Sequence, residues 1–175
     1  MRSRARYEKS DKPPEPPAPL KPGEALAYAV RALSQKSLTE RELETRLKRR
    51  NASAEVIAST LEKLREHKFV NDATVAEHAV RDTNKGSSAI RMKLRARGVN
   101  THTIEDALLT RDPDADLEGA LALTERYGPR WTGPRGYAKG FSFLARRGFH
   151  SGVIHKALEG LRDLSQPEDF ELETD

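Results

Sequence analysis

The chain of 175 residues contains no cysteine, which excludes a disulfide framework, a thiolate-ligated zinc site and a cysteine nucleophile. It also lacks any apolar run near the roughly 20 residues that a membrane-spanning helix needs. The basic N-terminal residues are not followed by an apolar segment, so we expect no signal peptide. These absences predict a cytoplasmic protein with no membrane partner.

Signatures of catalysis are missing as well. The sequence has no phosphate-binding glycine loop, no nucleophile elbow and no dinucleotide-binding glycine pattern. Its five histidines lack the i,i+4 spacing of helix-borne metal ligands. Asp112, Asp114 and Asp116 resemble the start of a calcium loop, but Leu117 and Leu123 replace the required glycine and glutamate. We therefore predict a protein that is not an enzyme and has no metal site and no cofactor.

The charge is unevenly distributed along the chain. The formal net charge of +4, from 31 Lys and Arg against 27 Asp and Glu, is the sum of opposed regions. Residues 1–23 are basic and hold six of the ten prolines, which predicts a disordered or polyproline-like tail. Residues 163–175 are acidic and predict a second tail. The region between them is net positive and is the expected folded body.

The body contains a repeat of which three copies align without a gap. In each copy a leucine is followed after three residues by arginine, and then by glycine or asparagine. An isoleucine follows the first leucine after ten residues and another leucine after fourteen. The copies begin at Leu47, Leu94 and Leu144. Self-similarity at this period is typical of helical repeat proteins.

The repeat predicts helices separated by tight turns. Leu43 and Leu47, like Ile90 and Leu94, are four residues apart and share one face of a helix. The glycine or asparagine suits the left-handed residue that ends a helix. Ser37–Glu40 fits a capping box. The expected caps of the helices that follow the turns are Ser53, Thr101 and Ser151.

A further helix precedes these two in each copy, beginning near Gly23, near Asp72 and after Pro113. No stretch alternates with period two for long enough to indicate a strand. We predict an all-α fold of three tandem three-helix repeats at residues 24–71, 72–112 and 113–162. One unit buries little surface alone, so the units are expected to stack into an elongated, curved rod.

Basic residues cluster near the end of the second helix of each unit. Cations in a last turn offset the helix macrodipole, which explains a single arginine per helix but not the longer runs. We predict that part of this basic stripe contacts an anionic partner, with a phosphate backbone and an acidic protein groove both open. The basic stripe comprises Arg46, Lys48, Arg49, Arg50, Arg91, Lys93, Arg95, Arg97, Arg146 and Arg147.

The third unit holds most of the aromatic residues of the body. Large side chains suit the core of a terminal unit that lacks a neighbour on one side. Two of the aromatic residues lie in a stretch rich in glycine and proline, where they could instead form a contact patch or stack on bases. This candidate patch comprises Trp131, Arg135, Tyr137 and Lys139.

Three stretches of the body together resemble a known family. Phe69-Val-Asn-Asp72 is similar to its junction between units, and Asn84-Lys-Gly86 followed by residues 90–99 looks like its most characteristic stretch. Arg126-Tyr-Gly128 followed by residues 143–149 is similar to its third-repeat signature. With their order and spacing, these stretches resemble the RecX family, regulators of the RecA recombinase. Two departures are Asn51, where the later copies have glycine, and the two tails.

The resemblance implies a non-enzymatic regulator, mainly an inhibitor, that binds in the groove of the ATP-bound RecA filament on single-stranded DNA. Such a protein limits filament growth, ATP hydrolysis, strand exchange and co-protease activity. Direct contact with single- or double-stranded DNA is also implied, and we expect a monomer. Two alternatives are a general DNA-binding protein with helix-turn-helix-like basic repeats and a helical scaffold for an acidic protein.

Overall fold

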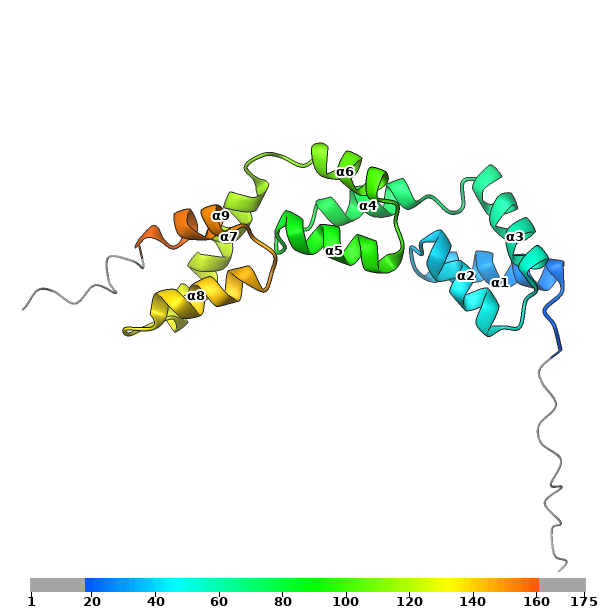
Figure 1. Cartoon of the computed structure of the whole chain (residues 1–175), viewed down its shortest axis with the longest axis horizontal. Helices are drawn as coiled ribbons and strands as arrows, with labels where there is room; N and C mark the ends of the chain where they lie inside the picture. Colours follow the sequence, from blue (N-terminus) through cyan, green and yellow to red (C-terminus); the bar gives the residue numbers. More distant parts are fainter. Residues whose placement is uncertain (1–17, 161–175) are drawn as a thin grey trace, which may run out of the picture.

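A computed structural model describes residues 18–160, which form a shallow arch of helices (Figure 1). Within this range there are helices and no strands, and the predicted all-α fold is confirmed. The predictions for the tails at residues 1–17 and 163–175 lie outside the described residues. The elements are α1 (Pro22–Gln35), α2 (Glu40–Arg49), α3 (Ala54–Glu66), α4 (Asp72–Val80), α5 (Ser87–Arg97), α6 (Thr101–Leu109), α7 (Ala115–Tyr127), the 3₁₀-helix η1 (Gly128–Arg130), α8 (Gly136–Ala145) and α9 (Ser151–Ala157).

The helices pack in groups of three, α1–α3, α4–α6 and α7–α9, each around its own apolar core. The prediction that the leucine and isoleucine pairs of α2 and α5 face the core is confirmed, because each is at most 1% exposed. Residues at matching repeat positions fill matching places in the three cores. They are Leu47, Leu94 and Leu144 from the second helices and Ile57, Ile104 and Ile154 from the third.

The turn between the second and third helices has the same backbone in all three repeats. Asn51, Gly98 and Gly148 have φ values of 59°, 89° and 81°, so each adopts the left-handed conformation. This confirms the predicted helix ends, including asparagine in the place of glycine. The N–H of the next residue then donates to the carbonyl of the repeat's first leucine, which closes the turn.

The residue that caps the third helix follows the left-handed residue by two positions. Ser53 accepts from the backbone N–H of Val56, as predicted. The other two predicted caps are wrong by one residue, because the fixed length of the turn places Asn100 and His150 at the capping position. Thr101 and Ser151 instead become the first residues of α6 and α9.

The start of α2 also differs from the prediction. Thr39, not Ser37, caps the helix: its Oγ1 accepts from the N–H of Glu42 at 3.2 Å, and its N–H donates to Glu42 Oε2 at 3.0 Å. The capping box therefore lies two residues later than expected. The buried Leu38 ties the preceding residues to the first core and so delays the helix.

The first helix begins at Pro22, close to the predicted start near Gly23 and inside the segment predicted as a tail. Pro22 occupies the first helical position, where its missing N–H has no cost. The N–H of Lys21 donates to Glu24 Oε2 at 3.1 Å. Leu20 packs against the first core, and its N–H donates to the Asn51 carbonyl at 3.3 Å. The folded body thus includes residues just before 24.

Two joints connect the three repeats, and the same polar contact recurs in both. At the first joint, Asp72 Oδ1 accepts from the N–H of Glu40, the first residue of α2, at 3.0 Å. At the second joint, Asp116 Oδ2 accepts from the N–H of Ser87, the first residue of α5, at 3.0 Å. In each case a carboxylate from the next repeat satisfies a backbone donor that the helix start leaves open.

The second helices of the repeats follow one another head to tail. The hydroxyl of Thr39 donates to the Arg97 carbonyl at 2.7 Å, so the end of α5 meets the start of α2. The N–H of Gly86 donates to the Arg147 carbonyl at 2.9 Å, so the end of α8 meets the start of α5. A Cβ on Gly148 would lie 2.3 Å from the Ala89 nitrogen, so this approach requires glycine. The resulting row, α8–α5–α2, runs along the concave side of the arch (Figure 1).

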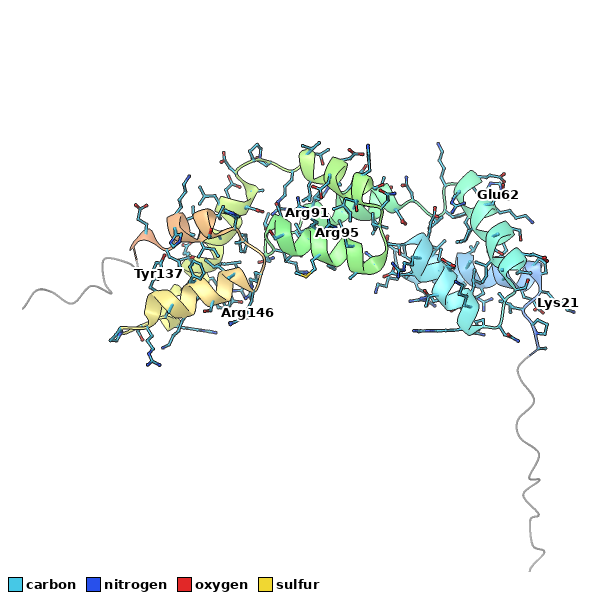
Figure 2. The ribbon with its side chains drawn as sticks, in the orientation of Figure 1. Lys21, Glu62, Arg91, Arg95, Tyr137 and Arg146 are labelled. Carbon is cyan, nitrogen blue, oxygen red and sulfur yellow. The ribbon has the colours of Figure 1, made fainter. Side chains whose placement is uncertain are left out.

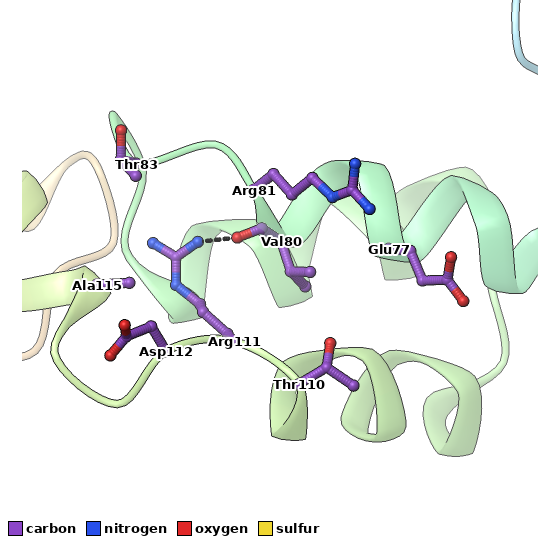
Figure 3. A pocket seen from close by; sticks show the side chains of 8 residues that line it. All are labelled: Glu77, Val80, Arg81, Thr83, Thr110, Arg111, Asp112 and Ala115. Atoms are coloured by element: carbon purple, nitrogen blue, oxygen red, sulfur yellow. Dashed lines mark hydrogen bonds between the residues drawn. The ribbon is translucent and has the colours of Figure 1, made fainter.

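An arginine that the sequence analysis did not single out organises the second joint. Arg111 extends from the end of α6 toward the end of α4 (Figure 3). Its guanidinium donates to the Val80 carbonyl, to the Lys85 carbonyl at 3.1 Å and to Asp116. The side chain is only 5% exposed. One buried cation therefore links the loop after α4 to the first turn of α7.

The carboxyl groups at the first joint should make the stability of the protein depend on pH. Hydrogen bonds from Arg97 lower the pKa of Glu42, and those from Arg65 lower the pKa of Glu40 below its ordinary 4.5. A lowered pKa stabilises the fold above the ordinary value, and this stabilisation is lost as the pH falls through the folded-state pKa. Burial raises the pKa of Asp72. This one carboxyl group therefore changes the stability with pH in the opposite direction to Glu40 and Glu42.

We therefore expect the urea midpoint of unfolding to fall between pH 6 and pH 3, and to fall less in Glu42→Gln. Both proteins would be unfolded in urea at each pH and followed by circular dichroism. An equal fall in the variant would mean that the Glu42–Arg97 pair contributes nothing to the acid sensitivity.

Candidate functional site

The basic stripe predicted from the sequence lies on the row of second helices. Its members from the first two repeats lie on α2 and α5 or directly after α2, and those of the third repeat follow α8. Figure 2 shows Arg91 and Arg95 on α5 and Arg146 near the end of α8. Because these helices follow one another along the concave side, the stripe is distributed over all three repeats.

The arginine that recurs in each repeat has an intramolecular partner every time. The guanidinium of Arg50 lies 4.7 Å from the ring centroid of Tyr28, and that of Arg147 lies 3.6 Å from the ring centroid of Phe143. Arg97 donates to both carboxylate oxygens of Glu42, at 2.9 and 2.8 Å, and to the Ser37 carbonyl. The recurring arginine thus contributes to packing within a repeat or to the first joint.

Two further members of the stripe form ion pairs. Lys48 Nζ lies 2.6 Å from Glu44 Oε1, and Arg91 donates to both carboxylate oxygens of Glu105 at 2.7 and 2.8 Å. Lys48 is well exposed, so its pair is weak and open to competition. The Arg91 pair connects α5 to α6 and contributes to the second repeat's own structure.

The remaining members have no ion-pair partner within residues 18–160, and they define the surface most available to an anion. We call them the free cations. On α5, the neighbouring ammonium of Lys85 lowers the pKa of Lys93, which indicates a locally positive potential. The free cations are Arg46, Arg49, Lys93, Arg95 and Arg146.

The candidate patch of the third repeat does not form as a single exposed cluster. Trp131 is 8% exposed and belongs to the third core, where its ring centroid lies 5.2 Å from that of Phe143. Gly140 leaves room for the indole, because a Cβ there would lie 2.8 Å from it. The placement of Trp131 in a contact patch is thus wrong: its apolar ring fills the space that the absent side chain leaves.

The other three residues of this candidate patch lie on or next to α8. Arg135 and Lys139 are exposed, and neither forms an ion pair with a described residue. Tyr137 is half-buried, and its hydroxyl forms a hydrogen bond with His155 Nδ1 at 2.5 Å. Arg135 and Lys139 therefore add to the positive charge near the start of α8.

A pocket at the first joint gathers basic residues that sequence reasoning missed. We call it the joint pocket. It has a volume of about 250 Å³ and lies between α2 and the end of α5. Lys36 and Arg41, which were not predicted as site residues, line it together with Arg46, Arg49 and Arg97. The spacing of Arg41, Thr45 and Arg49, which places them on one face of α2, was the available signal.

No helix within residues 18–160 is both long enough and apolar enough to cross a bilayer. Over the same range, no three His, Asp or Glu side chains come together in a way that could hold a metal ion.

Comparisons with known proteins identify the family to which this chain is similar. Residues 25–64 match the family model described as RecX, first three-helix domain. The chain is 36% identical over 149 residues to regulatory protein RecX of Deinococcus radiodurans, covering 83% of this chain and 72% of that protein. It is 37% identical over 147 residues to regulatory protein RecX of Thermus thermophilus, covering 83% of this chain and 94% of the relative.

Solved structures agree with the fold. The crystal structure of RecX from Lactobacillus salivarius superimposes with a TM-score of 0.71 at 24% identity, over 81% of this chain and 96% of that one. A second crystal structure, of regulatory protein RecX, gives a TM-score of 0.67 at 28% identity, over 81% of this chain and 74% of that one. Matched over most of its length by relatives and solved folds alike, the chain belongs to the RecX family.

Proposed function

We propose that this chain is a non-enzymatic regulator of RecA that binds the RecA filament on single-stranded DNA through its concave basic side and inhibits it. The relatives named regulatory protein RecX support the regulatory role. The observation that carries the proposal is that the free cations belong to α2, α5 and the end of α8, helices that follow one another along one side of an elongated arch. An extended anionic partner can engage such a surface at several points at once.

The direct test adds the full chain to RecA, single-stranded DNA and ATP and follows ATP hydrolysis. Inhibition at concentrations near that of RecA is the expected result. Strand exchange and co-protease activity should fall over the same range, since all three require the filament. Unchanged hydrolysis at a stoichiometric amount of the protein would refute the proposal.

A double charge reversal on α5 tests the surface itself. Lys93→Glu/Arg95→Glu removes two free cations and is expected to raise the concentration for half-inhibition about tenfold or more. The paired Arg91 and Arg97 are left intact, because glutamate there would face Glu105 or Glu42 and disturb the fold.

The matched control for this reversal is Lys63→Glu/Lys156→Glu, which changes the charge equally at exposed positions on α3 and α9. Circular dichroism should show equal helicity in the two variants. Equal loss of inhibition in the control would mean that net charge, and not the concave side, determines binding.

General DNA binding is the second candidate, favoured because none of the free cations forms a salt bridge with a described residue. Binding to a phosphate backbone alone weakens log-linearly with salt and needs no RecA. Affinity for bare DNA equal to that for the filament, at near-physiological salt, would favour this candidate.

A further inference from the structure

The joint pocket carries more positive charge than three other cavities among the described residues, one of which is lined by a single cation, Lys68. The cavity lined by Glu44, Lys48, Glu62 and Arg65 balances two cations with two carboxylates. The cavity around Arg111 likewise balances two arginines with Glu77 and Asp112 (Figure 3). The joint pocket has five cations and a single carboxylate, and is therefore strongly positive.

The single carboxylate of the joint pocket already accepts hydrogen bonds from within the protein. Glu42 accepts two hydrogen bonds from Arg97 and another from the Thr39 N–H. Its charge is thus offset by Arg97, and no other acidic side chain lines the pocket. The other four cations of the pocket are Lys36, Arg41, Arg46 and Arg49, and none of them forms a salt bridge within residues 18–160.

The backbone of the second repeat helps to position one of these cations. Gly98 has a φ of 89°, and a Cβ on it would lie 2.2 Å from Arg41 Cδ. The aliphatic part of Arg41 therefore lies directly against the glycine that ends α5. The contact brings a side chain of the first repeat onto the second repeat, so the cations of the pocket depend on both repeats for their placement.

We propose that the joint pocket binds a phosphodiester group of a nucleic-acid backbone. Arginine and lysine are the side chains that hold backbone phosphates, and their contacts carry no sequence information. No aromatic side chain lines the pocket, so it offers no ring on which a base could stack. Lys93 lies one helical turn before Arg97 on α5, and it continues the positive surface beyond the pocket, as a polymer with one charge per unit requires.

A phosphate in this pocket contacts two repeats at once. Lys36, Arg41, Arg46 and Arg49 belong to the first repeat, whereas Ala96 and Arg97 come from α5 of the second. Binding therefore holds the first joint at one angle. This extends the proposed function, on which it rests for the presence of nucleic acid beside the protein.

The test measures binding of a fluorescein-labelled oligothymidylate to the full chain by anisotropy, without RecA. Lys36→Gln/Arg41→Gln is expected to raise Kd about tenfold at about 0.1 M salt. Two fewer cations should also reduce the magnitude of the slope of log K against log salt by about 1.4. The matched control, Lys63→Gln/Lys156→Gln, removes equal charge at exposed positions outside the pocket and should change Kd less than about twofold.

Two results would overturn the assignment. One is equal weakening in the pocket variant and the control. The other is competition by polyglutamate as effective as that by unlabelled oligothymidylate of equal charge, which would identify a carboxylate ligand. Should Lys36→Gln/Arg41→Gln lose helicity, Arg49→Gln addresses the same pocket and is expected to weaken binding while the control does not. Failure of the chain to inhibit RecA, by contrast, would refute the proposed function and leave this measurement unaffected.

Discussion

Replacing Leu94 by alanine is expected to lower the free energy of unfolding by about 2–5 kcal/mol. Leu94 is fully buried and packs in the second core with Ile90, Val99 and Ile104. Its removal costs the transfer free energy of the lost methyl groups and leaves a cavity in a core formed by only three short helices. Urea unfolding followed by circular dichroism measures the change.

The control for Leu94→Ala lies two residues away on the same helix. Met92 is 67% exposed, so Met92→Ala changes a similar side chain to the same residue without opening a cavity. We expect its free energy of unfolding to stay within about 0.5 kcal/mol of the wild type. Similar losses in the two variants would show that α5 is rotated about its axis relative to the structure.

Arg111→Met is expected to cost about 3–5 kcal/mol, because it breaks a buried ion pair by removing one partner. The guanidinium of Arg111 donates to Asp116, which is only 18% exposed, and to backbone carbonyls of the loop after α4. Methionine keeps the apolar part of the side chain but supplies no donor. The carboxylate and the carbonyls are then left without their partner in a site that water reaches poorly.

A neighbouring arginine provides the control for this replacement. Arg81 lines the same cavity, is exposed and forms no ion pair with a described residue (Figure 3). Arg81→Met should change stability by no more than about 0.5 kcal/mol. In addition, Arg111→Met/Asp116→Asn should cost less than the sum of its single changes, since the two side chains interact. Additive losses would show that the pair is not coupled.

Local features of the chain predict most of the fold. The apolar spacing in α2 and α5 sets which residues face the core, and Asn51, Gly98 and Gly148 end helices wherever the repeat places them. These properties depend on residues within one or two turns of helix, so the sequence alone contains them. The misplaced caps of α2, α6 and α9 lie only one or two residues from their true positions.

The candidate site was harder to predict because its charges are balanced by distant partners. Arg97 looks like Arg50 in the repeat, yet it pairs with Glu42, 55 residues away in the chain. Arg111 contacts carbonyls 26 to 31 residues away. Trp131, in a stretch that looks like a loop, fills a space above Gly140. No periodicity encodes such pairings, so the sequence alone could not separate bound cations from free ones.

The contrast between apolar cores and polar joints has a mechanical consequence. We expect the joints, where hydrogen bonds connect one repeat to the next, to bend more easily than the repeats, each of which has its own apolar core. Because the two joints lie one after the other, small changes of angle at both joints add up to a larger displacement between the ends of the arch. Salt screens the more exposed Arg97–Glu42 pair of the first joint more than the buried Arg111–Asp116 pair of the second, and it leaves the apolar cores as they are. The span of the molecule should therefore vary with ionic strength more than its helicity does.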